Sequence, residues 1–219
     1  MLLQIANVID APLIDAVRAA CSAEGFWSEG GATAVGRAKA VKNNQQALAS
    51  GPAKGVLETL SKAILNHETV KSAAQPAALA RIMLNRHGEG MEYGAHVDAA
   101  YIDGVRTDLS FTLFLTEPES YDGGALVIDS AGAEDCIKLP AGSLVLYPTT
   151  SLHRVERVTR GARLCCVGWI KSRIRSSEDR AALYEIDRIG ADLQAIDAPG
   201  DIRDRLVNVR NNLLRRWGE

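Results

Sequence analysis

Short apolar segments separated by turn residues dominate residues 80–171, and they constrain the fold more than any other feature. Glycine-containing turns recur between them, at residues 88–90, 122–124, 140–142 and 160–161. The segments with strand character are 81–85, 93–98, 109–115, 125–128, 137–139, 143–147, 152–158 and 162–171. Several short strands at this spacing are typical of an all-β sandwich or barrel, and their number suits a double-sheet jelly roll.

Helical periodicity flanks this β region on both sides. Asp10 suits the N-cap of a helix that ends near residue 21, and a second helix is expected over residues 52–65. Ser176 suits the N-cap of a further helix, and another follows it. We therefore expect a mainly β fold with flanking helices (α+β). Its parts are an N-terminal strand and helix segment over 1–79, a jelly-roll core over 80–175 and a C-terminal helical extension over 176–219.

Each of the two C-terminal helices carries an apolar stripe. The stripes consist of Leu183, Ile186, Ile189, Leu193 and Ile196, and of Ile202, Leu206, Val209, Leu213 and Trp217. Such stripes usually pack against the core of the same chain. The alternative is a surface for a homodimer, and the sequence leaves both interpretations open.

Length and composition suffice for one sizeable core, or for one domain with helical appendages. Of the 219 residues 47% are hydrophobic, and the net charge of −2 comes from interspersed acidic and basic residues, so we expect no nucleic-acid partner. We expect no membrane association, because no apolar run approaches the roughly 18–20 residues that span a bilayer. The four cysteines show no C-x-x-C spacing, and the first ten residues lack the features of a signal peptide. We therefore expect a cytoplasmic protein.

Two histidines and one aspartate form the strongest chemical pattern. His96 and Asp98 are two residues apart, so on a strand both side chains would point to the same face. His153 follows 55 positions later and would have to come from another strand. Two imidazoles and a carboxylate are the facial triad that binds non-haem Fe(II) and leaves coordination positions open. An isolated H-x-D pair is weak evidence, so the surrounding sequence must support this interpretation.

Arg163 is the second candidate, and it depends on the turn that precedes it. A three-residue hairpin loop over residues 159–161, with Gly161 in the left-handed conformation, would pair Val158 with Ala162. His153 and Arg163 would then face the same way, whereas a two-residue loop would put them on opposite faces. An inward arginine needs an anionic partner. That partner is either the carboxylate of a ligand or a protein acid such as Asp108 or Glu92.

Several motifs occur in an order that matches a known family. They are Tyr93–Asp98, Thr112–Pro118, Tyr121–Gly124, Leu139–Pro148, Ser151–His153, Val158–Gly161 and Gly168–Ile170. With these motifs, residues 81–175 resemble the double-stranded β-helix of Fe(II)/2-oxoglutarate-dependent dioxygenases of the prolyl-4-hydroxylase type. The similarity to bacterial PKHD-type hydroxylases extends along almost the whole chain.

The resemblance implies a role for each candidate residue. His96, Asp98 and His153 would be catalytic and would bind Fe(II). Arg163, ten residues after the second histidine, would pair with the distal carboxylate of 2-oxoglutarate, and Tyr93 would line the cosubstrate pocket. The implied reaction hydroxylates a C–H bond and converts 2-oxoglutarate to succinate and CO2. The implied partners are O2, 2-oxoglutarate, L-ascorbate as reductant, and an unknown small-molecule, peptide or protein substrate.

One position departs from the family pattern, and one alternative function remains. Members often carry tyrosine nine residues before the first metal-binding histidine, where this chain has His87. His87 is therefore either a group that supports the site or a partly exposed loop histidine. Trp169 is either a wall of the pocket or part of the core.

The alternative function is a cupin-like metal protein, either a Zn or Mn enzyme or an iron sensor. An inward Arg163 and a three-ligand set with open positions favour the dioxygenase.

Overall fold

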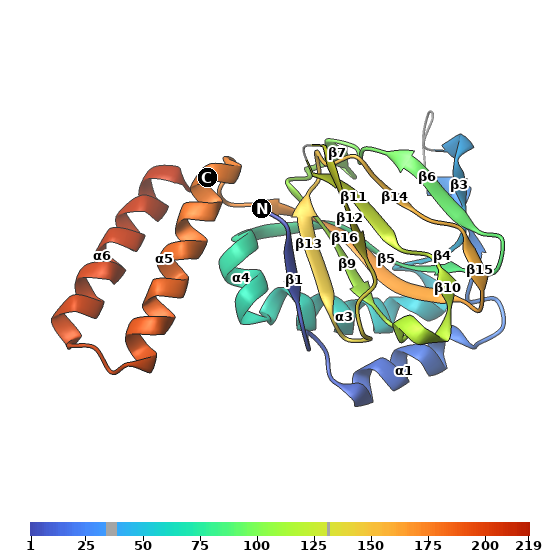
Figure 1. Ribbon diagram of the computed structural model, residues 1–219, viewed down its shortest axis with the longest axis horizontal. Coiled ribbons are helices and arrows are strands. Elements are labelled where there is room, and N and C mark those ends of the chain that lie inside the picture. Colours follow the sequence, from blue (N-terminus) through green and yellow to red (C-terminus); the bar gives the residue numbers. More distant parts are fainter. Residues whose placement is uncertain (34–38, 131) are drawn as a thin grey trace.

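Two antiparallel β-sheets lie face to face in the computed structural model, which describes residues 1–33, 39–130 and 132–219 (Figure 1). The larger sheet has the order β1 (Leu3–Ile5), β13 (Leu144–Pro148), β9 (Leu109–Phe114), β16 (Arg163–Ser172), β5 (Pro76–His87), β4 (Gln45–Leu48) and β2 (Ser28–Glu29). The smaller has the order β12 (Ala133–Ile137), β11 (Leu126–Ser130), β14 (His153–Val155), β6 (Glu92–His96) and β3 (Lys42–Asn43). This arrangement confirms the predicted jelly roll with flanking helices.

Two short ribbons complete the β-structure. They are β10 (Asp122–Gly123) paired with β15 (Val158–Arg160), and β7 (Tyr101–Ile102) paired with β8 (Val105–Arg106). Single 3-10 turns occur at residues 30–33, 51–53 and 118–120. The ribbons lie at the two ends of the sandwich, where the chain crosses from one sheet to the other (Figure 1).

Helices cover the outer face of the larger sheet and form a separate C-terminal hairpin. The covering helices are α1 (Ala11–Cys21), α3 (Lys54–Asn66) and α4 (Glu68–Ala74); the hairpin consists of α5 (Ser177–Ala195) and α6 (Gly200–Trp217). The predicted caps are confirmed, since Asp10 accepts a hydrogen bond from Leu13 N and Ser176 accepts one from Asp179 N. None of the helices within the described ranges is long and apolar enough to cross a membrane.

The larger sheet separates an apolar core from a more polar interior. Along β9, Leu109 and Leu113 belong to the core between this sheet and the helices, whereas Ser110 and Thr112 face the smaller sheet. Alternate residues of a strand point to opposite faces, so one strand serves both layers. The space between the sheets therefore holds a small apolar cluster and, next to it, a cavity lined by both polar and apolar side chains.

Two local predictions were wrong. His153 and Arg163 do not lie on paired strands: β14 pairs with β11 and β6, while β16 pairs with β5 and β9 in the other sheet. In a jelly roll, consecutive strands cross between sheets, so the turn at Gly161 (φ +75°) joins two layers instead of closing a hairpin. In addition, β6 ends at His96, so Asp98 lies just beyond the strand.

Candidate metal centre and cavity

Three ligand side chains converge between the sheets. One ligand atom from each of His96, Asp98 and His153 lies within 4.8 Å of the others. The Nε2 atom of each histidine is 3.7 Å from a different oxygen of the Asp98 carboxylate. His96 and His153 are register partners on β6 and β14, which brings together residues that are far apart in the sequence.

Hydrogen bonds orient these ligands. The Nδ1 atom of His96 is 2.8 Å from the carbonyl oxygen of Gly94, and that of His153 is 3.0 Å from the carbonyl oxygen of Ser151. A carbonyl can only accept, so each Nδ1 donates its proton to the backbone, and each Nε2 is the ring nitrogen that faces the cluster. Ser110 Oγ donates to Asp98 Oδ2 at 2.8 Å and holds the carboxylate from the opposite sheet.

Burial keeps the first histidine neutral. It lowers the pKa of His96 to about 4, and the neighbouring His153 adds to the effect, while the hydrogen bond to Gly94 and the charge of Asp98 oppose it. The imidazole is therefore unprotonated at neutral pH, as a metal ligand must be. Tyr93 stacks on this ring with centroids 3.7 Å apart and an interplanar angle of 18°. Burial, and then the charge of Asp98, raise the pKa of Tyr93, so its hydroxyl stays protonated.

All five predicted site residues line one cavity of about 260 Å³. Tyr93, His96, Asp98 and His153 belong to the smaller sheet or its edge, and Arg163 projects from β16 of the larger sheet. His153 and Arg163 therefore face each other across the sandwich and do not lie side by side, although the expectation that both point inward is correct.

Arg163 is buried and lacks an anionic partner among the described residues. Its side chain is 1% exposed, and its Nε and Nη2 atoms have no hydrogen-bond partner in the described ranges. Nη1 contacts Cys165 Sγ at 2.9 Å. The two protein acids considered as partners are engaged elsewhere, because Asp108 pairs with Arg106 and Glu92 with Arg157. A buried unpaired guanidinium is costly, so this site is suited to an anion from outside.

His87 lies directly beside this arginine. The two residues are register partners on β5 and β16, and His87 is also 1% exposed. Burial lowers the pKa of His87 well below its usual value, with the charges of Arg163 and Lys42 contributing. Both ring nitrogens lack a hydrogen-bond partner within the described part of the chain, as does the buried hydroxyl of Tyr121. His87 is thus a buried strand residue beside Arg163 and not a loop histidine.

The strand alternation would have revealed several lining residues that the motif search missed. Residues 81, 83, 85 and 87 of β5 all point into the cavity, as do residues 163, 167 and 169 of β16. Trp169 is therefore a wall of the cavity. Lys42 and Tyr147 also line it. Lys42 carried no sequence signal, because it follows a Gly- and Ala-rich stretch with no clear periodicity.

The donor set fits an iron ion and a dicarboxylate. Two imidazoles and a carboxylate offer three ligand atoms on one side, and the cavity leaves the other side open. The unpaired donors of Arg163, His87 and Tyr121 offer a separate place for a carboxylate. The residues present therefore match both groups that the sequence resemblance implied.

Comparisons with known proteins agree with this chemistry. The sequence profile of the 2OG-Fe(II) oxygenase superfamily matches residues 82–171. A PKHD-type hydroxylase of Parvibaculum lavamentivorans is 44% identical over the full length of both chains. Another, from Prochlorococcus marinus (strain MIT 9303), is 46% identical over 89% of each chain. A crystal structure of a Pseudomonas putida prolyl-4-hydroxylase superposes with a TM-score of 0.56 at 23% identity, covering 78% of this chain and 92% of that one, and so shares the fold.

Proposed function

Because this chain belongs to the PKHD-type hydroxylases, a family of 2-oxoglutarate-dependent dioxygenases in the 2OG-Fe(II) oxygenase superfamily, we propose that it hydroxylates a C–H bond of its substrate. His96, Asp98 and His153 would hold Fe(II), and Arg163 would hold the distal carboxylate of 2-oxoglutarate. The observation that carries this proposal is the buried, unpaired Arg163 in the same cavity as the three ligands. A zinc hydrolase or an iron sensor has no use for such a group.

The bound groups would supply the oxidising chemistry: one oxygen atom of O2 enters the substrate as a hydroxyl group, and the other enters the succinate formed when 2-oxoglutarate loses CO2. The protein's own residues orient and isolate the reaction. The Nδ1–H bonds fix both imidazoles, and Ser110 fixes Asp98. Leu126 and Val155 line the cavity, and their apolar side chains would limit access of water.

The inner donors would select the cosubstrate. Arg163 would bind its carboxylate through the free Nε and Nη2 atoms, and neutral His87 and Tyr121 would each donate one further hydrogen bond. Tyr93 would line the pocket beside His96. We propose L-ascorbate as the reductant that restores the iron after turnover without substrate, on the basis of the family resemblance alone.

Anaerobic optical titration tests the proposal. Metal-free protein receives Fe(II) and then 2-oxoglutarate, and we expect a broad visible charge-transfer band only after both additions. Arg163→Met should require at least tenfold more 2-oxoglutarate, because it loses a charge-assisted carboxylate contact worth roughly 1.5–3 kcal/mol. The matched control is Arg160→Met, since this exposed arginine pairs with Asp122 on the surface.

The band must also depend on the predicted ligands. Asp98→Ala should abolish it at stoichiometric Fe(II). Tight Fe(II) binding by the wild type with no band after addition of 2-oxoglutarate would contradict the dioxygenase proposal and favour the zinc, manganese or sensor alternative.

A further inference from the structure

A second cationic group lies in the cavity, away from Arg163. Lys42, on β3 of the smaller sheet, donates hydrogen bonds to Thr33 Oγ1 at 3.1 Å and Gln46 Oε1 at 3.2 Å, both neutral acceptors. Its ammonium lies 5.4 Å from the centroid of the Tyr93 ring, which itself stacks on His96. One aromatic ring therefore separates this charge from the metal ligands.

The hydrogen-bond partners of Lys42 are neutral, and no aspartate or glutamate of the described residues forms an ion pair with it. The sequence from residue 30 to residue 57 contains no acidic residue. Burial lowers the pKa of Lys42 to about 8, with Arg81 adding to this and Asp98 opposing it. An ammonium that is partly removed from water and has no anion beside it is suited to binding one.

This cation lies on the other side of β5 from Arg163. Its acceptor Gln46 belongs to β4 and is the register partner of Asn85, whereas Arg163 belongs to β16 and is the register partner of His87. The strands β4 and β16 flank β5 on opposite sides, so two strand spacings of about 4.8 Å each separate them. The charge of Lys42 still reaches His87, whose pKa it helps to lower. Arg163 and Lys42 are therefore two separate cationic groups of one cavity.

We propose that the primary substrate is a small organic acid or amino acid derivative whose carboxylate binds Lys42. This inference rests on the proposed function, because it takes Arg163 to hold 2-oxoglutarate. Anchoring the carboxylate at Lys42 leaves the rest of the substrate beside Tyr93, whose ring stacks on the metal ligand His96. The small cavity favours such a molecule over a bulky one.

Matched pairs of acids and amides test the proposal. The probes are N-acetyl-L-proline, N-acetyl-L-leucine and N-acetyl-L-lysine, each compared with its carboxamide, added anaerobically to the Fe(II)/2-oxoglutarate complex. We expect at least one acid to perturb the charge-transfer band at a tenfold lower concentration than its amide. Lys42→Met should reduce this preference for the acid over the amide to below twofold, whereas Lys42→Arg should keep it. The control is Lys39→Met, which removes an exposed lysine three residues earlier and should also keep the preference.

The outcomes separate this inference from the function on which it rests. A wild-type band with 2-oxoglutarate, combined with equal effects of acids and amides or no effect of either, overturns the substrate proposal and leaves the dioxygenase intact. Survival of the acid preference in Lys42→Met also overturns it. If the band itself does not form, the proposed function fails, and the substrate proposal fails with it.

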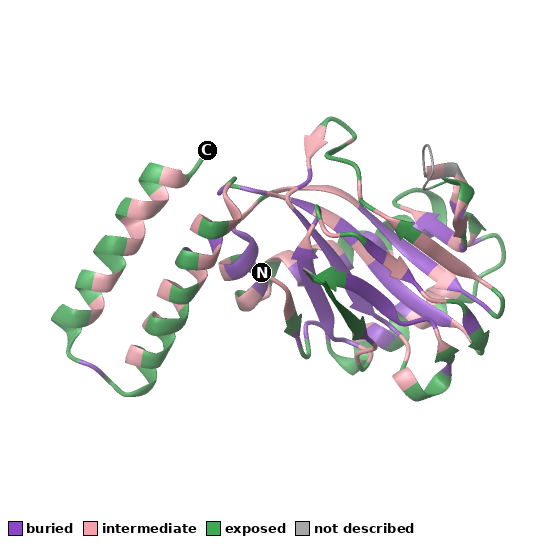
Figure 2. Ribbon diagram, turned by 45° about the horizontal axis from the view of Figure 1, so that its top comes forward, coloured by how far each residue is buried: buried purple, intermediate pink, exposed green. Residues whose placement is uncertain are grey.

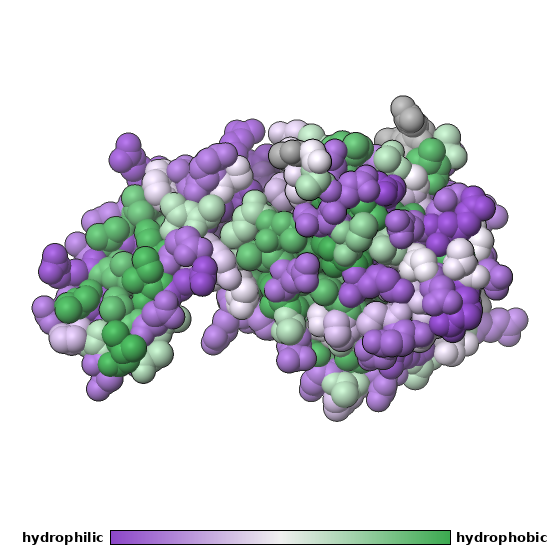
Figure 3. Space-filling model, in the orientation of Figure 1, coloured by the Kyte–Doolittle hydropathy of each residue, from purple (hydrophilic) through white to green (hydrophobic). Residues whose placement is uncertain are grey.

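An independent observation concerns the C-terminal hairpin. No residue of α6 is buried within the part of the chain that the structure describes, and α5 buries only Arg180 and Leu183 (Figure 2). Apolar side chains gather on one face of the hairpin (Figure 3). This hairpin face consists of Ile186, Ile189, Leu193 and Ile196 of α5 and Ile202, Leu206, Val209 and Leu213 of α6, spaced three or four residues apart. Ile189, Ile196, Ile202 and Val209 are exposed.

The charges of the two helices are complementary. Helix α5 carries five acidic and two basic residues, a net charge of −3, and α6 carries two acidic and five basic residues, a net charge of +3. A dimer through the hairpin faces has a two-fold axis in the plane between them. If this axis is parallel to the helices, α5 of each chain lies over α6 of the other, and opposite charges meet. If it is perpendicular to the helices, α5 lies over α5 and α6 over α6, and like charges meet.

We infer that the occupant of the hairpin face is a second copy of this chain, and that the two hairpins form an antiparallel four-helix bundle. Sedimentation velocity at 5–100 μM should give a dimer for the wild type and a monomer for Ile189→Glu. Val207→Glu is the matched control, because Val207 is equally exposed but two residues from Val209 and so on the other side of α6. A monomeric wild type, or a dimeric Ile189→Glu, would overturn the inference.

Cross-linking distinguishes the two axes. In the proposed bundle Ile189 lies level with Val209 of the second copy, so the double variant Ile189→Cys, Val209→Cys should form intermolecular disulfides on oxidation. Ile189→Cys alone should not. Efficient cross-linking of the single variant would show α5 against α5 and would contradict the charge argument.

Discussion

The buried residues around Arg163 are arranged for a ligand and not for stability. Arg163 and Tyr121 hold donors with no acceptor among the described residues, and His87 has two ring nitrogens in the same condition. Each unsatisfied buried group costs about 1–3 kcal/mol, and folded proteins keep few of them. A carboxylate would satisfy several at once, so binding of cosubstrate should stabilise the protein as well as supply a reactant.

The buried histidine gives this region a pH dependence. The pKa of His87 lies well below 6.5 in the folded protein, first because of burial and then because of Arg163 and Lys42, whereas in the unfolded chain it lies near 6.5. As the pH falls below 6.5, the unfolded state therefore takes up a proton that the folded state does not. The free energy of unfolding should decrease by up to about 1.4 kcal/mol per pH unit from this group.

Urea denaturation of metal-free protein at pH 7.0, 6.0 and 5.0 measures this effect. His87→Phe should show a shallower decrease in the free energy of unfolding than the wild type over the same range. Parallel slopes for the two proteins would mean that His87 is protonated in the folded state, contrary to its burial.

At the scale of elements, the turns that join the two sheets position the site. Gly161 has φ +75°, and a Cβ atom built there would lie 2.5 Å from the carbonyl oxygen of Ser120. This turn leads from β15 into β16, and Arg163 begins β16. The close approach of the two backbones therefore fixes where the arginine enters the cavity.

Gly161→Ala should destabilise the protein by roughly 1–3 kcal/mol and weaken binding of 2-oxoglutarate. Gly104→Ala is the matched control, because Gly104 has nearly the same φ of +76° in the β7–β8 turn but no atom within 4 Å of the added Cβ. The difference between the two variants in urea denaturation isolates the close contact from the backbone strain. Equal losses would show that the contact with Ser120 is unimportant.

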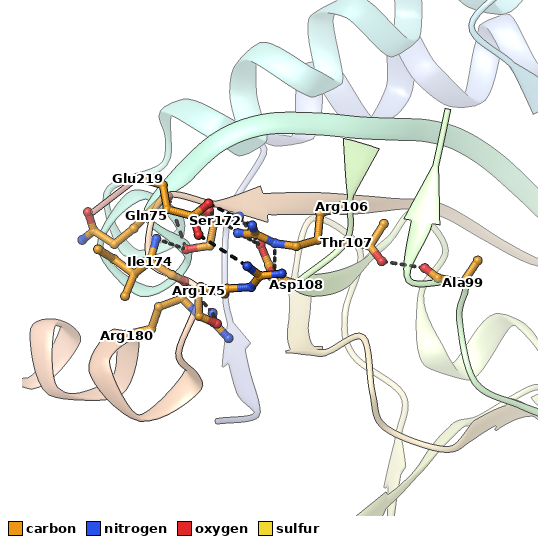
Figure 4. Close-up of polar contacts among 10 residues, drawn as sticks. All are labelled: Gln75, Ala99, Arg106, Thr107, Asp108, Ser172, Ile174, Arg175, Arg180 and Glu219. Atoms are coloured by element: carbon orange, nitrogen blue, oxygen red, sulfur yellow. Dashed lines mark hydrogen bonds and ion pairs between the residues drawn. The ribbon is translucent and has the colours of Figure 1, made fainter. Parts of the chain in front are cut away.

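At the scale of the whole molecule, an ionic network ties the C-terminal hairpin to the sandwich (Figure 4). Arg106 of β8 donates to Asp108 at 2.9 and 3.1 Å, to Glu219 at 2.9 Å and to the carbonyl oxygen of Ser172 at 3.2 Å. Arg180 of α5 donates to the carbonyl oxygen of Ile174 at 2.8 Å. The network joins the β7–β8 ribbon to the start of α5 and to Glu219, which follows α6.

Arg106→Met should lower the melting temperature by about 5 °C, because Asp108 is 9% exposed and would lose its cationic partner. Glu219→Gln should change it little, since the rest of the network remains. Differential scanning calorimetry measures both variants, and hydrogen exchange should show faster opening of α6 in the first. Equal melting temperatures for Arg106→Met and the wild type would contradict this role.

Local sequence patterns predicted most individual elements. The alternation in β9 and β16, the cap residues Asp10 and Ser176, and the glycine turns gave correct strands, helices and breaks, because these signals act over a few residues. Strand pairing is harder to predict from sequence. The hairpin prediction puts His153 and Arg163 on paired strands, whereas they lie in different sheets. The division at residues 79/80 and 175/176 stays a prediction, as does the cytoplasmic location.

The jelly roll, the family and the candidate ligands could be predicted from the sequence alone, because motif spacing and strand alternation are properties of the chain. The tertiary structure was needed to show that Arg163 has no anionic partner among the described residues, that His87 is buried beside it, and that Lys42 lies against the Tyr93 ring in the same cavity. It was also needed to show that no residue of α6 is buried within the described ranges. Burial and the absence of a partner depend on every neighbour in space, and those neighbours come from strands that are far apart in the sequence.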